Sequence, residues 1–201
     1  FEDASWRKIR FMPDHFERMT EFCPSVARVT RVCQMSSPIR RREESVDGVP
    51  VVGIEAAWHA IENRSVELGR PMSVIDNEQR RPVCLIEPAV RDKLRLDRDC
   101  IGDTLYISDR RYRIIGIVET RAESSMFGGH GESMKVYIPF ALAWRVYNEP
   151  WMHAIATSTS TDVTQEAAAE ARFLLRQRRQ LGPGDPDTFK LHVMEEYVDQ
   201  F

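Results

Sequence analysis

The hydrophobic pattern along the chain predicts a series of short strands. Several segments rich in Val, Ile and aromatic residues are bounded by Gly, Pro, Asp or charged residues, which is typical of strands in a folded domain. The segment 111–120 carries apolar residues on both faces, so we expect a central strand that is covered on two sides. Gly116 in its middle predicts a close approach by a neighbouring segment. The predicted strands cover residues 25–35, 49–54, 82–86, 104–108, 111–120, 134–138, 151–157 and 188–194.

Other segments repeat apolar residues at helical spacing. The clearest covers residues 163–180 and follows an Asp162 and Gln165 pair that resembles a capping box. Its apolar stripe consists of Ala167, Ala171, Leu174 and Leu175. Shorter helical patterns cover residues 13–23, 55–67 and 88–94 and begin again at Pro139, and turns are predicted at Asp47–Gly48 and Asp109–Arg110.

The order of these elements predicts an α+β fold. Strands and helices alternate toward both ends of the chain, whereas the middle, from about Arg81 to Ile138, is rich in strands. A compact α/β layer interrupted by a β-rich insertion fits this order, and the first and last thirds of the chain are then expected to form one sheet across the insertion.

Composition and charge narrow the class of protein. The 201 residues are 42% apolar and 29% charged, which is the balance of a globular chain with a real core. Lys and Arg total 28 against 31 Asp and Glu, so the net charge of −3 provides no field that would recruit nucleic acid. The longest apolar runs, such as Val49–Ile54 and Ile114–Val118, are far shorter than the roughly 20 residues of a membrane-spanning helix. Because the chain begins at Phe1 without Met and ends on a helical composition at Phe201, we expect a piece of a longer protein.

The sequence lacks the usual motifs of catalysis and cofactor binding. The five histidines show no metal-binding spacing, and the glycine-rich segment 127–131 is followed by Glu132 where a phosphate-binding loop needs Lys. His130 within that segment could bind or titrate if exposed, although an ordinary loop is the simpler interpretation. The four cysteines are Cys23, Cys33, Cys84 and Cys100. Buried free thiols are the favoured interpretation, but the spacing of the cysteines also permits disulfides. We therefore predict no catalytic, cofactor-binding or metal-binding residues.

Six phrases, taken in order, resemble the periplasmic core domain of MacB-type (FtsX-like) ABC transporter permeases. They are Val51–Ile54, residues 63–70, Pro82–Ile86, residues 101–107, Tyr112–Val118 and Val136–Pro139. The resemblance rests on their order and spacing, because no phrase is specific alone. The chain departs from the family at Pro88, where relatives commonly have a small residue, and Cys84 and Cys100 are not family hallmarks.

The resemblance implies a fold and a mechanical role. Domains of this family lie between the first and second membrane helices of a permease and combine a porter subdomain, built from both chain ends, with an inserted β-rich sabre subdomain. For this chain, that implies a porter-like α/β subdomain of residues 1–70 and 139–201 and a sabre-like subdomain of residues 71–138. The implied function is transmission of conformational change from cytoplasmic ATP hydrolysis to the periplasm during efflux or export. The domain itself would be neither an enzyme nor the holder of a cofactor.

The resemblance also suggests where the chain would bend and what it would meet. Hinges are expected where the chain passes between the subdomains, although ordinary turns are an alternative; the candidates are Gly69, Arg70, Pro71 and Pro139. A loop of the β-rich part is the candidate contact for a periplasmic adaptor or a cargo; it consists of Met126, Phe127, Gly128, Gly129 and His130.

The expected partners follow from the same resemblance. They are the protein's own transmembrane helices and ATPase domain and a periplasmic adaptor, with no nucleic acid, and the isolated periplasmic domain is expected to be a monomer. An alternative function is a cargo-binding or lipoprotein-releasing module of a related permease, which would need an exposed apolar groove. A small enzyme would instead need titratable residues converging in a deep pocket. The transported substance and the subfamily stay open.

Overall fold

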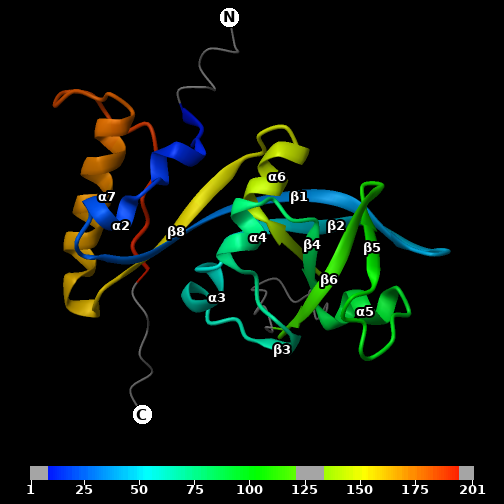
Figure 1. Ribbon diagram of the computed structural model, residues 1–201. Helices are drawn as coiled ribbons and strands as arrows, with labels where there is room; N and C mark the ends of the chain where they lie inside the picture. Colours follow the sequence, from blue (N-terminus) through cyan, green and yellow to red (C-terminus); the bar gives the residue numbers. More distant parts are fainter. Residues whose placement is uncertain (1–8, 121–133, 195–201) are drawn as a thin grey trace, which may run out of the picture. The chain divides into compact units, whose positions relative to one another are not determined.

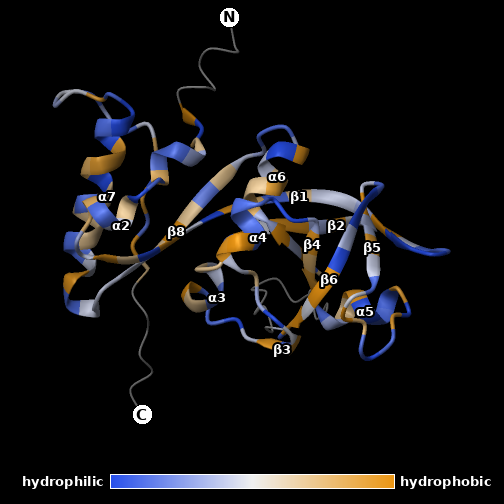
Figure 2. Cartoon of the chain, in the orientation of Figure 1, coloured by the Kyte–Doolittle hydropathy of each residue, from blue (hydrophilic) through white to orange (hydrophobic). Residues whose placement is uncertain are grey.

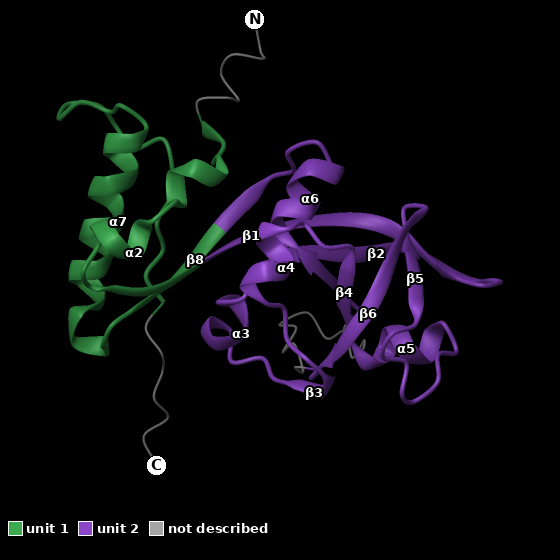
Figure 3. Cartoon of the chain, viewed as in Figure 1, with its two compact units in different colours: residues 1–29, 154–201 green, residues 30–153 purple. Residues whose placement is uncertain are grey.

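The structure, a computed structural model, describes residues 9–120 and 134–194. The chain forms two compact units: unit 1 comprises Phe1–Val29 and Ala154–Phe201, and unit 2 comprises Thr30–His153 (Figure 3). Both chain ends therefore belong to unit 1. The subdomain boundaries predicted at 70/71 and 138/139 are not the boundaries of these units, and the division into porter-like and sabre-like parts stays a prediction.

Strands and helices alternate through most of the described chain (Figure 1). The strands are β1 (Val26–Arg41), β2 (Glu44–Ile54), β3 (Val66–Gly69), β4 (Val83–Ile86), β5 (Thr104–Ile107), β6 (Arg110–Val118), β7 (Val136–Pro139) and β8 (Met152–Ser158). The helices are η1 (Pro13–Phe16), α2 (Met19–Phe22), α3 (Trp58–Ile61), α4 (Val74–Glu78), α5 (Pro88–Lys93), α6 (Phe140–Val146), η2 (Thr161–Val163) and α7 (Thr164–Arg178). None of the helices in the described residues is long and apolar enough to cross a membrane.

Within the described residues, six strands of unit 2 close into a ring. Their order is β2, β7, β4, β6, β5 and β1, and the pairing of β1 with β2 closes the ring. The β2 and β7 pair and the β4 and β6 pair are parallel, whereas the other neighbours are antiparallel. β3 lies off this ring and pairs with β6. The predicted α+β class is thus found as a mixed fold built on a closed sheet.

The core of unit 2 lies on the most apolar strands. Every residue of β4 and β7 is buried, and β6 is buried without interruption from Ile114 to Val118. Figure 2 shows the same change along β6, from hydrophilic at its Arg110 end to hydrophobic further along. β6 pairs with β3, β4 and β5, so the prediction of a central strand is confirmed.

Pairing with distant strands overrode several local predictions in unit 2. The first hairpin turns at Arg42 and Glu43. The predicted turn at Asp47–Gly48 is wrong, because this dipeptide lies inside β2, where the register of its pairing with β1 shifts. The helix predicted over 55–67 is only α3, because the chain then pairs with β6 as β3. The second hairpin turns one residue earlier than predicted, at Ser108 and Asp109, both with positive φ as a type I′ turn requires.

Unit 1 contains the longest helix, and its apolar stripe is buried as predicted. The predicted capping box is wrong: Val163 occupies the N-cap without a side-chain hydrogen bond, and Asp162 lies in the short helix η2. The strand predicted over 188–194 does not form in the described residues. Instead, Arg179 donates to the Thr188 carbonyl oxygen at 3.0 Å and its guanidinium lies 5.6 Å from the centre of the Phe189 ring, so side-chain contacts position this segment.

Candidate functional site

The hinge candidates Gly69 and Arg70 lie directly against β6. Gly69 has φ +82°, and a Cβ atom there would lie 2.2 Å from the carbonyl oxygen of Ile115. The Arg70 backbone N–H donates to that oxygen at 3.0 Å. A Cβ at Gly116 would in turn lie 2.7 Å from the Arg70 carbonyl oxygen. The predicted close approach at Gly116 is confirmed, and Gly69 is required where no side chain fits.

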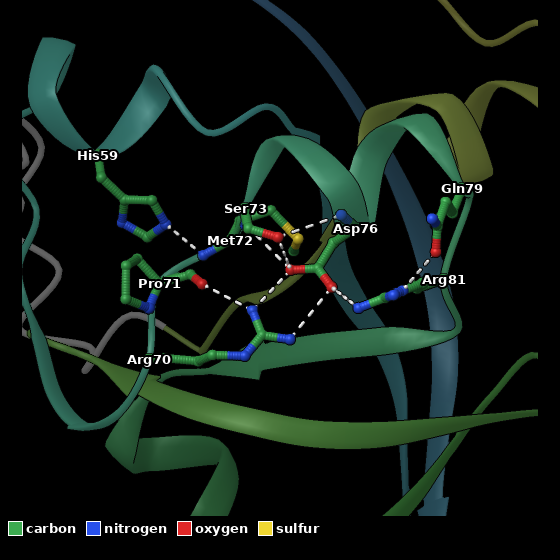
Figure 4. A network of polar contacts seen from close by, with 8 residues as sticks. All are labelled: His59, Arg70, Pro71, Met72, Ser73, Asp76, Gln79 and Arg81. Atoms are coloured by element: carbon green, nitrogen blue, oxygen red, sulfur yellow. Dashed lines mark hydrogen bonds and ion pairs between the residues drawn. The ribbon is translucent and has the colours of Figure 1, made fainter.

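The Arg70 side chain is held by a buried carboxylate (Figure 4). Its guanidinium donates to the two oxygens of Asp76 at 2.6 and 3.1 Å and to the Pro71 carbonyl oxygen at 3.1 Å. Arg81 reaches the same carboxylate from another side, with 3.8 Å between Nη1 and Oδ1. The Asp76 side chain is 0% exposed, whereas the side chains of Arg70 and Arg81 are each 46% exposed. One buried anion therefore orients two partly exposed cations.

Asp76 is placed by the first turn of α4. Ser73 is the N-cap of this helix, and its hydroxyl accepts from the Asp76 backbone N–H at 3.2 Å. In return, the Asp76 carboxylate accepts from the Ser73 backbone N–H at 3.0 Å and from its hydroxyl at 2.7 Å. Burial by itself raises the pKa of Asp76, but hydrogen bonds from Arg70 and Ser73 outweigh it and lower that pKa to about 2. The carboxylate is therefore ionised at neutral pH.

His59 joins this network from α3. Its Nε2 accepts from the Met72 backbone N–H at 3.1 Å, so the ring proton lies on Nδ1, which is 3.1 Å from the carbonyl oxygen of Arg64. Burial lowers the pKa of His59, against the raising effect of the hydrogen bond to the Arg64 backbone. The neutral ring therefore fixes the segment that connects Arg70 to α4.

A second buried carboxylate, Glu87, lies at the end of β4 and is 1% exposed. It accepts from the Tyr137 hydroxyl at 2.9 Å, from the Lys135 backbone N–H at 2.9 Å and from the Arg64 guanidinium at 3.0 Å. The same guanidinium donates to the Glu119 carbonyl oxygen at 2.7 Å. Glu87 and Arg64 thus fix the chain on both sides of the segment 121–133, in which the partner-loop candidates at 126–130 lie outside the described residues.

The remaining hinge candidate, Pro139, ends β7 and precedes α6. It pairs with Ile54 in the parallel ladder between β2 and β7. Two residues later, the Ala141 backbone N–H donates to the Asn77 side-chain oxygen at 2.9 Å, and the Asn77 amide donates to Glu55 at 3.3 Å. The start of α6 is therefore linked to α4, the helix that carries Asp76.

These contacts position segments and supply no reactive group. In the described parts of the chain, no three His, Cys, Asp or Glu side chains are grouped so as to hold a metal ion. All four cysteines are buried free thiols. Burial raises the pKa of Cys33 to about 12, so this thiol is protonated at neutral pH. The site can hold three parts of the chain in fixed positions: residues 69–71, the described residues on either side of segment 121–133, and the start of α6.

Asp76 and Glu87 were not predicted as site residues. Asp76 had a local signal, because Ser73 three residues earlier has capping-box spacing. Glu87 had none, because one acid after a buried strand looks the same in sequence whether it is solvated or buried. Its partners Arg64, Lys135 and Tyr137 are far away in the chain.

The chain matches the family described as MacB-like periplasmic core domain over residues 4–172. It belongs to this family. The predicted resemblance is confirmed, and the chain is the extracytoplasmic domain of a MacB-like ABC transporter permease. Domains of this kind are not catalytic. A search of curated proteins found no match.

Solved structures share the MacB-like fold at low sequence identity. The extracellular domain of the noncanonic ABC-type transporter YknZ from Gram-positive bacteria is 17% identical, with a TM-score of 0.72 and 90% of each chain covered. The periplasmic region of MacB from Actinobacillus actinomycetemcomitans is 16% identical, with a TM-score of 0.70 over 90% of this chain and 80% of that one. A domain of a putative permease from Porphyromonas gingivalis is 17% identical, with a TM-score of 0.60 over 81% and 68%.

Proposed function

We propose that this MacB-like domain transmits conformational change from cytoplasmic ATP hydrolysis to the periplasm. A lever of this kind needs a body that moves without deforming. The observation that supports the proposal is the closed sheet of unit 2, in which each strand of the ring pairs on both sides. Its partners would be the transmembrane helices and ATPase domain of the full-length protein, with a periplasmic adaptor on the far side.

The strand pairing in unit 2 limits where this domain can bend. β1 pairs with β5, β2 with β7 and β3 with β6, so strands from residues 1–70 are hydrogen-bonded to strands that reach into residues 71–138. Hinges at residues 69–71 and at Pro139 would have to open such ladders, together with the Arg70 and Asp76 ion pair. We propose that the closed sheet moves as one body, and bending at these hinge candidates is the competing proposal.

Distance measurements between spin labels in the full-length permease, before and after ATP addition, separate the two. One pair, at Asp47 and Asp97, spans the predicted subdomains; a control pair, at Asp97 and Asp109, lies within one of them. These three aspartates are exposed. A third pair joins Asp97 to a membrane helix.

Movement of one body leaves the Asp47 to Asp97 distance constant while the distance from Asp97 to the membrane helix changes. A changed Asp47 to Asp97 distance beside a constant control distance would favour the hinges. If no distance responds to ATP, the proposal that this domain transmits motion is wrong.

Cargo binding is the second candidate function, and one observation favours it. Next to Arg70, unit 2 has a surface hollow of about 440 Å³ that combines arginines with apolar residues. A lever does not need such a hollow, whereas a binding module does.

A further inference from the structure

The hollow beside Arg70 lies where β6 changes partners. β5 pairs with β6 up to Arg113, and β3 pairs with it from Gly116 onward. Between these two stretches, Ile114 and Ile115 pair with neither β5 nor β3. Instead, the backbone N–H of Gly102, in the loop before β5, donates to the Ile114 carbonyl oxygen at 2.8 Å, and the backbone N–H of Arg70 donates to the Ile115 carbonyl oxygen at 3.0 Å. The hollow is lined by Gly69, Arg70, Arg81, Val83, Ile101, Arg113, Ile114 and Ile115.

The apolar part of the hollow is preformed. Val83, Ile114 and Ile115 are buried core residues, so their positions are set by the closed sheet. Ile101 is 37% exposed and offers an apolar side chain to the hollow. Gly69 contributes backbone only, because any side chain would collide with Ile115.

The residues that line the hollow carry excess positive charge. Arg70, Arg81 and Arg113 line the hollow, and Asp76 is the carboxylate that Arg70 and Arg81 share. Among residues 9–120 and 134–194, no carboxylate pairs with Arg113. A guanidinium has five N–H donors, and the three hydrogen bonds of Arg70 to Asp76 and Pro71 leave two for another acceptor.

We propose that this hollow binds a small amphiphilic anion, with its carboxylate or phosphate group at Arg70, Arg81 and Arg113 and its apolar chain against Ile101. Planar guanidinium groups match both kinds of anionic group, and the pairing with Asp76 orients two of them before a ligand arrives. A volume of about 440 Å³ suits a small molecule, and an apolar surface with a few polar groups is typical of ligand pockets.

This inference rests on the second candidate function and is independent of mechanical transmission. Another hollow, in unit 1, has a volume of about 320 Å³ and is a weaker candidate. Its lining mixes Asp14 and Glu17 with Arg18 and Arg178, and its aromatic residue Phe22 already has both of these guanidinium groups within 6 Å of the ring centre, at 5.8 and 5.6 Å. It therefore offers no clear excess of charge, and its aromatic side chain already has cationic neighbours.

Calorimetric titration of the 201-residue chain tests the proposal, with dodecyl phosphate and laurate as probes below their micelle concentrations. We expect both to bind, and Arg113→Ala to weaken that binding at least tenfold because the charged hydrogen bonds are lost. Arg113→Lys should have an intermediate effect, since it keeps the charge but not the planar group. Arg111→Ala is the matched control: it removes an exposed arginine from the same strand, outside the hollow, and should leave binding unchanged.

Three further titrations separate the parts of the ligand. Inorganic phosphate should bind at least tenfold more weakly than dodecyl phosphate, and Ile101→Ser should weaken the dodecyl probes but not phosphate. Dodecyltrimethylammonium should not compete with them. Equal binding by Arg113→Ala and the unchanged chain, equal affinity for phosphate and dodecyl phosphate, or effective competition by the cationic probe would each overturn the proposal. The distances between spin labels, which test mechanical transmission, do not depend on this result.

Discussion

Replacing the buried carboxylate by Asp76→Asn should destabilise unit 2 by about 2–3 kcal/mol at pH 7. The pKa of Asp76 falls from 3.8 to about 2 on folding, which corresponds to about 2 kcal/mol of stability at neutral pH. The amide also loses the charged hydrogen bonds from Arg70, each worth about 1.5–3 kcal/mol in general. Because Arg70 is 46% exposed, water solvates it once the anion is gone, which keeps the loss below the 3–5 kcal/mol typical of a broken buried pair.

The pH dependence identifies the charge as the cause. A carboxyl whose pKa is lowered by folding stabilises the folded state above its unfolded pKa, and this contribution disappears as the pH falls through its folded pKa. The advantage of the unchanged chain over Asp76→Asn should therefore be constant above about pH 5 and fall between about pH 4 and pH 2, with about half of the titrating part left at pH 3. Urea unfolding followed by circular dichroism at pH 7, 4 and 3 measures this difference.

Asp97→Asn is the matched control, because Asp97 is exposed and lies outside the network. It should unfold at the same urea concentration as the unchanged chain at every pH. If Asp76→Asn behaved like this control at pH 7, or if its deficit were the same at pH 3 as at pH 7, then the ionised carboxylate would not be what holds Arg70 and α4.

Other consequences can be measured separately. Gly116→Ala should cost about 2 kcal/mol, because its Cβ would lie 2.7 Å from a backbone oxygen, whereas Gly184→Ala, with nothing within 4 Å, should be neutral in urea unfolding. Folding lowers the pKa of His59, so its contribution to the stability of the folded state is complete above its unfolded pKa of about 6.5 and is lost as the pH falls below that value. The variant His59→Gln should therefore lose less stability between pH 7 and pH 5 than the unchanged chain does. An equal loss in both would contradict this. Replacing residues 126–130 by Gly and Ser in the full-length permease should weaken adaptor binding in a pull-down without lowering ATPase activity. Unchanged adaptor binding would exclude these residues as the contact. Light scattering of the 201-residue chain at micromolar concentration should show a monomer, and a stable dimer would be evidence against that expectation.

The elements that could be predicted from sequence are those whose signals are local. β4 is an uninterrupted apolar run after a proline, and the β5 and β6 hairpin carries an Asp at its turn. α7 has a buried stripe long enough to reveal helical spacing. These predictions held because neighbouring residues alone determine the pattern.

The failures in unit 2 share a different cause. The turn at Asp47–Gly48 was expected from a dipeptide that favours turns, but pairing with β1 continued past it and placed it within the bulged part of β2. The segment 55–67 was expected to be one helix, yet Val66 near its end pairs with Val118 in a strand. In both places the ladder to a distant strand outweighs local preference, and sequence spacing contains no information on that ladder.

The candidate site shows the same limit. The segment Gly69 to Pro71 was predicted as a chain crossing. Asp76 has capping-box spacing from Ser73, but its role as the anchor of Arg70 is seen only from its zero exposure and from the hydrogen bonds that Arg70 donates to it. Glu87 depends on Arg64 and Lys135, which lie 23 and 48 residues away. Buried acids resemble surface acids in a sequence, so networks of this kind become visible only when the chain is folded.

A ring of paired strands also limits how another polypeptide can attach. An open sheet offers its outermost backbone groups to an incoming extended peptide, and many recognition domains bind in this way. Here that route is narrowed in unit 2. Within the described residues, the strands off the ring are β3, which is only Val66–Gly69 long, and β8, of which only Met152 and His153 belong to this unit. A protein that docks on this unit would therefore have to recognise side chains and loops, so its specificity would reside in residues that can vary without disturbing the ladder beneath them.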